Sequence, residues 1–419
     1  MKKTTLILTI FSVACINAQV LNLKLKDNIT KEISSKKEDN SFLIARQTYE
    51  NGDYKKALEL FENIKKKAPR NLRVQLEIAQ CYVKLEEYDK AKEIFNSLLD
   101  KKLPKTVRDN IFLRLQNIEQ NSTKNSFKIE TFASILYDSN IDNSSENDIY
   151  SVYVPILGPV NILNENKKRS DKALELAAIF NHTYKVNKNF FLENKLTAYT
   201  QKYSKYSEKS INLLSLSLAP AFYFEKSKFS IKLYKDLIQL NNSSYQDNLY
   251  IKPEFFYNLS KNLVYKTSFK WNKKEYKNDI YKDRNSYEYT YSNSLINLSE
   301  TFGLNQFTIN LSKEEKRDGI RTDVDNKSYS FEYTNRYPLK NNILLSNSLG
   351  YKKINYDETD VNFLSKRSDR NLNYSLELTK TFTNNLSVGL NYNYTDKQSN
   401  HSPFEYDKHI TKLFLFYPF

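Results

Sequence analysis

The spacing of apolar residues divides the chain into two regions with different periods. From residue 41 to about 120, apolar residues recur every three or four positions among Ala, Leu, Glu and Lys, as in amphipathic helices. From Phe127 onward the period is two, and Tyr287, Tyr289 and Tyr291, for example, are separated by single polar residues. Such alternation is typical of strands with one apolar face. The pattern therefore predicts an α+β chain in two parts, helical first and all-β second.

The helical region repeats itself. Residues recur 34 positions later in matching pairs: Tyr54 and Tyr88, Ala57 and Ala91, Phe61 and Phe95. This period, with Gly52-Asp53 before the first tyrosine and Pro69 closing the unit, resembles the tetratricopeptide (TPR) repeat. In such a stack the alanines let helices approach closely, and the phenylalanines fill the space between helix pairs. We expect two repeats, at about 38–71 and 72–105, within a helical domain spanning residues 19–126.

TPR stacks present a concave groove, and the repeat register assigns four residues to it: Arg46, Tyr49, Gln80 and Lys84. A groove lined by these side chains is a candidate site for a client or a chaperone. An ordinary solvated polar face explains the same residues equally well.

The β region, 127–419, divides into about fourteen strands of roughly ten residues, separated by polar turns of two lengths. Short turns, rich in Asn, alternate with longer polar loops at about 138–171, 204–210, 241–247, 275–285, 317–327, 356–369 and 398–405. Asn tolerates left-handed backbone and replaces the scarce Gly in the short turns. A soluble sandwich shows the same alternation of residues but not of loop lengths, so the pattern favours a transmembrane antiparallel β-barrel.

The last strand places four apolar residues on one face: Leu413, Leu415, Tyr417 and Phe419. A terminal Phe on such a strand resembles the signal read by the barrel-assembly machinery of Gram-negative outer membranes. An even number of strands returns both ends of the barrel to one side of the membrane. We therefore expect an outer-membrane barrel surrounded by lipid, with the helical domain in the periplasm.

The first eighteen residues predict a secretory signal peptide, with a basic start at Lys2 and Lys3 and a short apolar core. The residues before Cys15 faintly resemble a lipoprotein cleavage site, so a lipid anchor on Cys15 is a second interpretation of the leader. After the leader there is no apolar run of the roughly 18 residues that a membrane helix needs.

Composition and charge exclude several other classes. The net charge is +15, from 64 basic and 49 acidic residues, but the basic residues are spread over the whole chain, so we expect no nucleic-acid binding. A basic lumen selective for anions is one interpretation, and a general bias toward Lys and Asn is another. The three His are far apart, and the six Gly show no phosphate-binding spacing. The sequence predicts a monomer that is not an enzyme and holds no metal or cofactor.

The most distinctive motif lies where the first strand runs into a long loop. It comprises Tyr137, Asp138, Ser139, Asn140, Ile141 and, after Asp142, Asn143. Together with a TPR segment and a fourteen-stranded barrel, this motif resembles the surface lipoprotein assembly modifier (Slam) family. Asp138, Asn140 and Asn143 are expected either to form a hydrogen-bonded turn at the barrel rim or to contact a client.

The resemblance implies a translocon that moves lipoproteins or related secreted proteins to the cell surface. The alternatives from other classes are a TPR-barrel exopolysaccharide exporter and a diffusion porin. Residues 153–160 of the same long loop are unusually apolar, so we expect them to form a lid, a plug or a client-binding patch.

Overall fold

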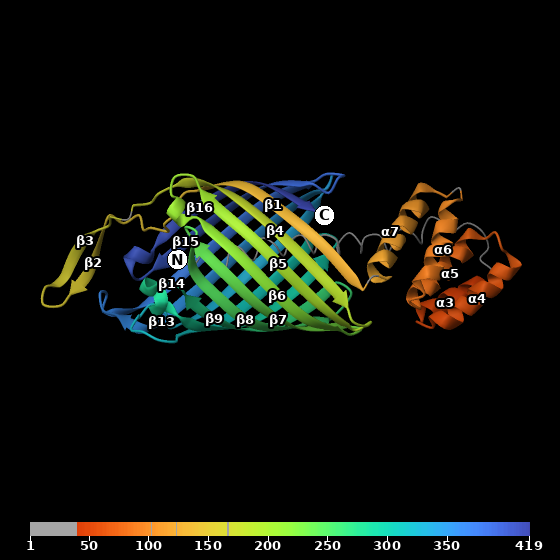
Figure 1. Cartoon of the computed structure of the whole chain (residues 1–419), viewed down its shortest axis with the longest axis horizontal. Coiled ribbons are helices and arrows are strands. Elements are labelled where there is room, and N and C mark those ends of the chain that lie inside the picture. Colours follow the sequence, from red (N-terminus) through yellow and green to blue (C-terminus); the bar gives the residue numbers. More distant parts are fainter. Residues whose placement is uncertain (1–39, 102, 123, 166) are drawn as a thin grey trace. The chain divides into compact units, whose positions relative to one another are not determined.

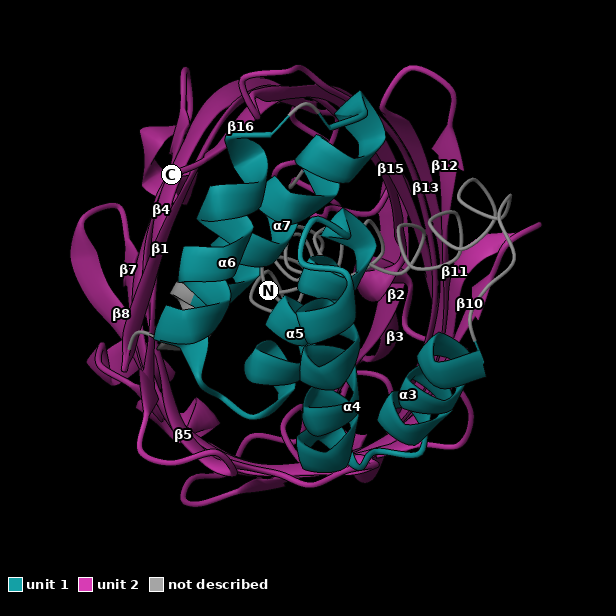
Figure 2. Cartoon of the chain, turned by 90° about the vertical axis from the view of Figure 1, so that its right-hand side faces the viewer, with its two compact units in different colours: residues 1–123 teal, residues 124–419 magenta. Residues whose placement is uncertain are grey.

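The computed structural model describes residues 40–101, 103–122, 124–165 and 167–419. The chain divides into two compact units, residues 1–123 and residues 124–419, which are referred to as the helical unit and the barrel (Figure 2). The division falls three residues before the expected boundary, because the first strand begins at Asn125 rather than at Phe127. The signal peptide expected at residues 1–18 lies outside the described residues.

Five helices make up the described part of the helical unit, and each packs against the next along the chain. They are α3 (Asn40–Glu50), α4 (Tyr54–Lys67), α5 (Leu72–Lys84), α6 (Tyr88–Leu99) and α7 (Lys105–Ser122). Short polar side chains start two of them: Asp53 accepts a hydrogen bond from the backbone N–H of Lys56, and Asn71 from those of Arg73 and Val74. Among these described helices, none is both long and apolar enough to cross a membrane.

The repeat residues form the core of the helical unit. Ala57, Phe61, Ala91 and Phe95 are all 0% exposed. The first pair lies in one apolar cluster with Phe42 and the second pair in a neighbouring cluster, so each repeat supplies one layer of the stack. Tyr88 packs against the second cluster. Tyr54 meets the ring of Tyr49 edge to face, and the carbonyl of Pro69 accepts a hydrogen bond from the Gln75 side chain.

Both repeats need a left-handed residue between their two helices. Gly52 fills this position in the first repeat with a φ of 87°, and Glu86 fills it 34 residues later with a φ of 62°. A side chain in this conformation costs roughly 1–2 kcal/mol relative to glycine. The second repeat thus keeps the backbone geometry of the motif without its glycine.

Fourteen antiparallel strands close into a barrel (Figure 1). They are β1 (Asn125–Asp138), β4 (Asp171–Lys185), β5 (Phe190–Tyr203), β6 (Ile211–Tyr223), β7 (Ser227–Leu240), β8 (Ser243–Asn258), β9 (Leu263–Tyr276), β10 (Ser286–Ser299), β11 (Gly303–Lys316), β12 (Asn326–Leu339), β13 (Ile343–Asp360), β14 (Ser365–Thr381), β15 (Ser387–Ser399) and β16 (Tyr406–Pro418). Each strand pairs with its neighbour in sequence, and β16 pairs with β1 to close the ring. The predicted fold is therefore confirmed.

The period of two places alternate side chains inside and outside the ring. In β4, Ala173, Glu175 and Ile179 point inward and are buried, whereas Leu174 and Leu176 point outward and are exposed. Because closure pairs the backbone polar groups of neighbouring strands, the apolar outer face can contact hydrocarbon.

One end of the barrel carries short turns and the other carries the long connections. The expectation that Asn supplies left-handed backbone is confirmed at Asn241, Asn242, Asn341, Asn342 and Asn385, all of which have positive φ. The long connections number five rather than seven: 139–170, 204–210, 277–285, 317–325 and 400–405.

The prediction of a long loop is therefore wrong at two places. Residues 241–247 shrink to a two-residue turn because β8 begins at Ser243, and 356–369 shrink to 361–364 because β13 and β14 continue to pair there. In both segments, polar side chains that face the barrel interior made strand residues look like loop residues.

The last strand carries its four predicted residues on the outer face. Leu413, Leu415 and Phe419 are exposed, and the ring of Tyr417 meets that of Phe419 edge to face. The Phe419 backbone N–H donates to the carbonyl of Ile129 on β1, at 2.7 Å. Recognition of this strand by an assembly machinery stays a prediction.

Candidate functional site at the barrel rim

Asp138, the last residue of β1, is buried at the long-loop end of the barrel. Its carboxylate lies 2.8 Å from the ammonium of Lys408 on β16 and accepts a 2.7 Å hydrogen bond from the Tyr203 hydroxyl on β5. It also accepts the backbone N–H of Asn140, at 3.0 Å. Asp138 therefore links the first strand to the last strand and to β5.

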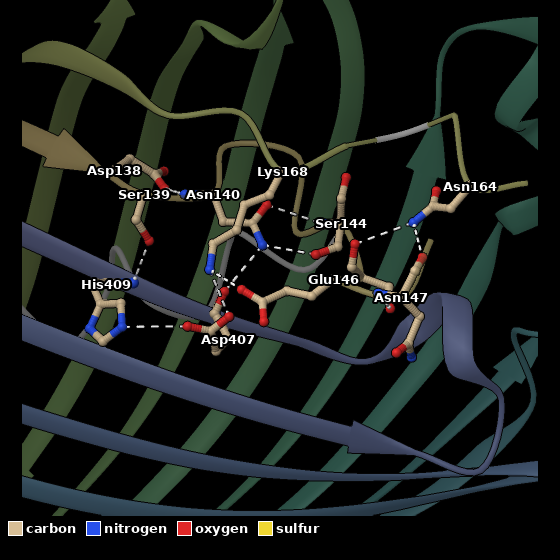
Figure 3. Close-up of polar contacts among 11 residues, drawn as sticks. Asp138, Ser139, Asn140, Ser144, Glu146, Asn147, Asn164, Lys168, Asp407 and His409 are labelled. Carbon is tan, nitrogen blue, oxygen red and sulfur yellow. Dashed lines mark hydrogen bonds and ion pairs between the residues drawn. The ribbon is translucent and has the colours of Figure 1, made fainter. Parts of the chain in front are cut away.

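Asn140 is fully buried and uses both ends of its amide. Its Nδ2 donates to the carbonyls of Ser144, at 2.9 Å, and of Asp407, at 3.1 Å. Its Oδ1 accepts the Ser144 backbone N–H, at 3.0 Å. The side chain closes a turn in its own loop and ties that turn to β16 (Figure 3).

The neighbouring motif residues hold the same turn. Ser139 exchanges two hydrogen bonds with the backbone of His409, of 3.0 and 2.9 Å. Ile141 is buried in an apolar cluster with Leu136, and Asn143 takes the left-handed conformation, with a φ of 53°. The Asn143 side-chain oxygen accepts a hydrogen bond from Lys408. Tyr137 is exposed on the outer face and makes no contribution to this turn.

Asp142 anchors the returning end of the same loop. Arg169 donates to both of its carboxylate oxygens, at 2.6 and 2.9 Å, and Lys209 lies 2.7 Å away in the next long loop. Partial burial alone raises the pKa of Asp142, but the bonds from Arg169 and Lys209 outweigh it and lower the pKa to about 2. The Arg169 guanidinium also lies 4.2 Å from the ring centre of Tyr206.

Lys168 completes the set, with its ammonium 2.7 Å from Glu146 and 2.8 Å from Asp407 (Figure 3). We call the connection of residues 139–170 loop L1. We call the residues that fasten it the rim clasp: Asp138, Asn140, Asp142, Asn143, Lys168, Arg169, Asp407 and Lys408. The rim clasp holds both ends of L1 against β16 and the β5–β6 loop, and contact of the motif with a client stays a prediction.

Sequence reasoning found the first half of the rim clasp and missed the second half. Asp142, Lys168, Arg169, Asp407 and Lys408 were not predicted as site residues, although the charges at the end of L1 and at the start of the last strand were visible. Barrel closure, which places β16 beside β1, brings Asp407 and Lys408 to the motif, whereas the pairing of β4 with β1 brings the end of L1 there.

The apolar part of L1 forms a hairpin of β2 (Ile149–Val154) and β3 (Gly158–Leu163). The hairpin projects beyond the barrel end (Figure 1), so the plug interpretation is wrong. The backbone N–H of Tyr153 donates to the carbonyl of Asn362 in the β13–β14 turn. At the tip, Ile156 and Leu157 are 103% and 73% exposed, which leaves a lid or a client-binding patch as the remaining interpretations.

Three of the four candidate TPR groove residues, Arg46, Tyr49 and Lys84, lie in one run of contacts through the ring of Tyr54. The Arg46 guanidinium lies 2.6 Å from Glu77, and Tyr49 packs against the core, where burial raises its pKa to about 12. Lys84 lies 5.8 Å from the ring centre of Tyr54, and Gln80 is half-buried. Arg46 and Tyr49 are thus engaged within the stack, and client binding by these residues stays a prediction.

The inner wall of the barrel carries charges of both signs. Lys412 lies 3.0 Å from both oxygens of Glu175, and Glu254 pairs with three lysines within 3.1 Å: Lys232, Lys252 and Lys266. Glu254 is outnumbered by its lysines, and selectivity of the lumen for anions stays a prediction. In the described part of the chain, no group of three or more His, Cys, Asp or Glu is placed to hold a metal ion.

The fold and the rim clasp together define a two-part outer-membrane protein, with a tetratricopeptide helical unit and a closed fourteen-stranded barrel. A family model for the tetratricopeptide repeat matches residues 49–104, and the model described as surface lipoprotein assembly modifier matches residues 127–415. The second match covers more than half of the chain, and the chain belongs to this family. The resemblance inferred from the motif is confirmed, and the family implies lipoprotein clients.

Several solved barrels are also similar to this chain. OprD from Pseudomonas aeruginosa is 10% identical, with a TM-score of 0.36 over 70% of this chain and 95% of that chain. A bacterial polysaccharide outer membrane secretin is 8% identical, with a TM-score of 0.40 over 71% and 100%. A loop-deletion mutant of OmpT, an outer membrane protein of Vibrio cholerae, is 7% identical, with a TM-score of 0.42 over 71% and 100%. Among curated proteins, none matches the sequence.

Proposed function

We propose that this chain is an outer-membrane translocon that delivers lipoproteins, or related secreted proteins, to the cell surface. The observation that carries the proposal is the family match over residues 127–415, which spans the barrel and includes the rim clasp. In this proposal, the short-turn end of the barrel and the helical unit face the periplasm, and the long-loop end faces outward.

The parts of the chain have separate roles in this proposal. The helical unit receives the client or its chaperone, and the barrel conducts the client outward. The rim clasp holds L1 fixed at the exit, where the exposed hairpin tip at Ile156 and Leu157 offers an apolar contact. The protein works as a monomer in lipid after insertion by the barrel-assembly machinery. It acts without a cofactor, without nucleic acid and without an enzymatic step.

Deletion of the gene tests the proposal. Specific lipoproteins are expected to disappear from the surface, measured by protease shaving of intact cells, while they remain in the periplasm. Complementation with the native chain should restore them. Unchanged shaving of every surface lipoprotein would overturn the proposal, and loss of exopolysaccharide or of small-solute uptake instead would favour an exporter or a porin.

A further inference from the structure

A groove of about 810 Å³ crosses the outer surface of the barrel over β16, β1, β4, β5, β6 and β7. Its floor consists of small side chains on three neighbouring strands: Thr131 and Ala133 on β1, Ala178 on β4, Ala198 and Thr200 on β5. Ala133, Ala178 and Ala198 are the three alanines that point outward in the described part of the barrel. On the other strands, the outer positions include larger residues such as Leu249, Phe269 and Leu311.

The groove runs diagonally between the two ends of the barrel. One row of side-by-side residues crosses six strands in register: Tyr417, Thr131, Ala178, Ala198, Leu214 and Leu237. The row begins near the end of β16, at the short-turn end, and finishes three residues before the end of β7, at the long-loop end. Five strand spacings give a length of about 24 Å. A fatty acyl chain, which spans one leaflet of about 15 Å, fits within this length.

The groove ends in polar groups at the long-loop end. Thr200 donates to Asn212, at 2.8 Å, and Asn212 donates to Gln239, at 3.2 Å. Beside them, Lys202 donates to Asn242, at 2.8 Å. These side chains lie where the outer face of the barrel approaches its rim, and their amides and ammonium suit ester carbonyls at the level of lipid headgroups.

The groove also crosses the least paired junction of the barrel. The β1–β16 ladder has nine residue pairs, from Glu130↔Pro418 to Asp138↔Ile410, whereas β1–β4 has fourteen. Of all the strand pairs in the barrel, β1–β16 has the shortest ladder. A client chain inside the barrel that stays joined to a lipid group outside it requires the wall to open between two strands. Opening at the β1–β16 junction breaks fewer backbone hydrogen bonds than opening at another junction.

We propose that this groove holds the acyl chains of a client lipoprotein's lipid anchor during delivery, and this inference rests on the proposed function. An anchor that entered the charged lumen would expose its hydrocarbon to water and to ionised side chains. The groove instead gives it an apolar path between the two membrane interfaces, and small floor residues leave room for it that Leu or Phe would fill.

Photo-crosslinking tests where the anchor lies. A benzophenone amino acid replaces Ala198 in the full chain, and Thr267, a small outward residue on β9, serves as the matched control position. Illumination of cells that express an acylated client is expected to crosslink position 198, and not 267, to the client's N-terminal lipopeptide. Adducts with phospholipid alone, or equal client adducts at both positions, would overturn the inference.

Filling the groove provides the second measurement. Ala178→Trp and Ala198→Trp are expected to reduce surface display of the lipidated client toward the level of the deletion strain, while Thr267→Trp leaves display at the native level. Heat-modifiable gel mobility confirms that all three barrels assemble. If deletion abolishes display but the assembled groove variants retain it, the groove inference fails and the proposed function stands. If deletion has no effect on display, the proposed function fails first.

Discussion

Replacing Asn140 with Ala should release the start of L1 from the barrel. The change leaves the buried Ser144 N–H without its partner, at a cost of about 1–3 kcal/mol, and removes two bonds to carbonyls worth roughly 0.5–1.5 kcal/mol each. A total of about 3 kcal/mol raises the fraction of open loop by roughly a hundredfold, because 1.4 kcal/mol is tenfold.

With L1 facing outward as proposed, trypsin treatment of intact cells measures this opening, since Lys167, Lys168 and Arg169 lie in L1. Cleavage in the Asn140→Ala variant should be faster by up to that factor. Asn147→Ala is the matched control, because Asn147 lies exposed in the same loop and its side chain contacts the β15–β16 loop through one long hydrogen bond, of 3.4 Å to Glu405. Equal cleavage rates in the two variants would refute the conclusion that Asn140 fastens L1.

Three other changes test separate parts of the chain. The pKa of Asp142 is about 2 in the folded loop and about 3.9 in an unfolded one. The carboxylate's contribution to the stability of the folded loop is therefore complete above about pH 4 and is lost as the pH falls toward 2. Pepsin cleavage of L1 should therefore rise over that range in the native chain, but be high already at pH 4 in Asp142→Asn. Glu86→Gly should stabilise the helical unit by about 1 kcal/mol by relieving the left-handed side chain, whereas Gly52→Ala should destabilise it; urea unfolding followed by circular dichroism checks both signs. Phe419→Asp should reduce the heat-modifiable barrel in outer-membrane fractions, and Phe382→Asp, which changes an exposed phenylalanine in a short turn, should not; equal loss in both would contradict a terminal assembly signal.

Most of the barrel could be predicted because its outer face must be apolar, which imposes the period of two on the sequence. The errors have the same origin. In β8, Gln246 and Asn248 face the lumen and are as polar as loop residues, so the alternation was lost near the strand end. The extensions of β13 and β14 were missed for a similar reason, since Asp369 points inward.

Only the local half of the rim clasp could be predicted. Asp138, Asn140 and Asn143 are close in sequence, and their residue types indicate a hydrogen-bonded turn. Their partners Asp407 and Lys408 come from the far end of the chain. The register between the first and last strands depends on the stagger of the whole closed ring, which no local pattern encodes. The helical core was easier, because Phe61 and Phe95 occupy equivalent places in a repeat.

The hydrogen bond between Lys408 and Asn143 joins residues 265 positions apart, so it forms only after every intervening strand has found its place. L1 is therefore expected to stay protease-sensitive during insertion and to become resistant when β16 docks on β1. Closed barrels are expected to differ from barrels in which β16 has not yet paired with β1 chiefly in the protease sensitivity of L1. Resistance of L1 to an added protease is thus an expected mark of a completed barrel.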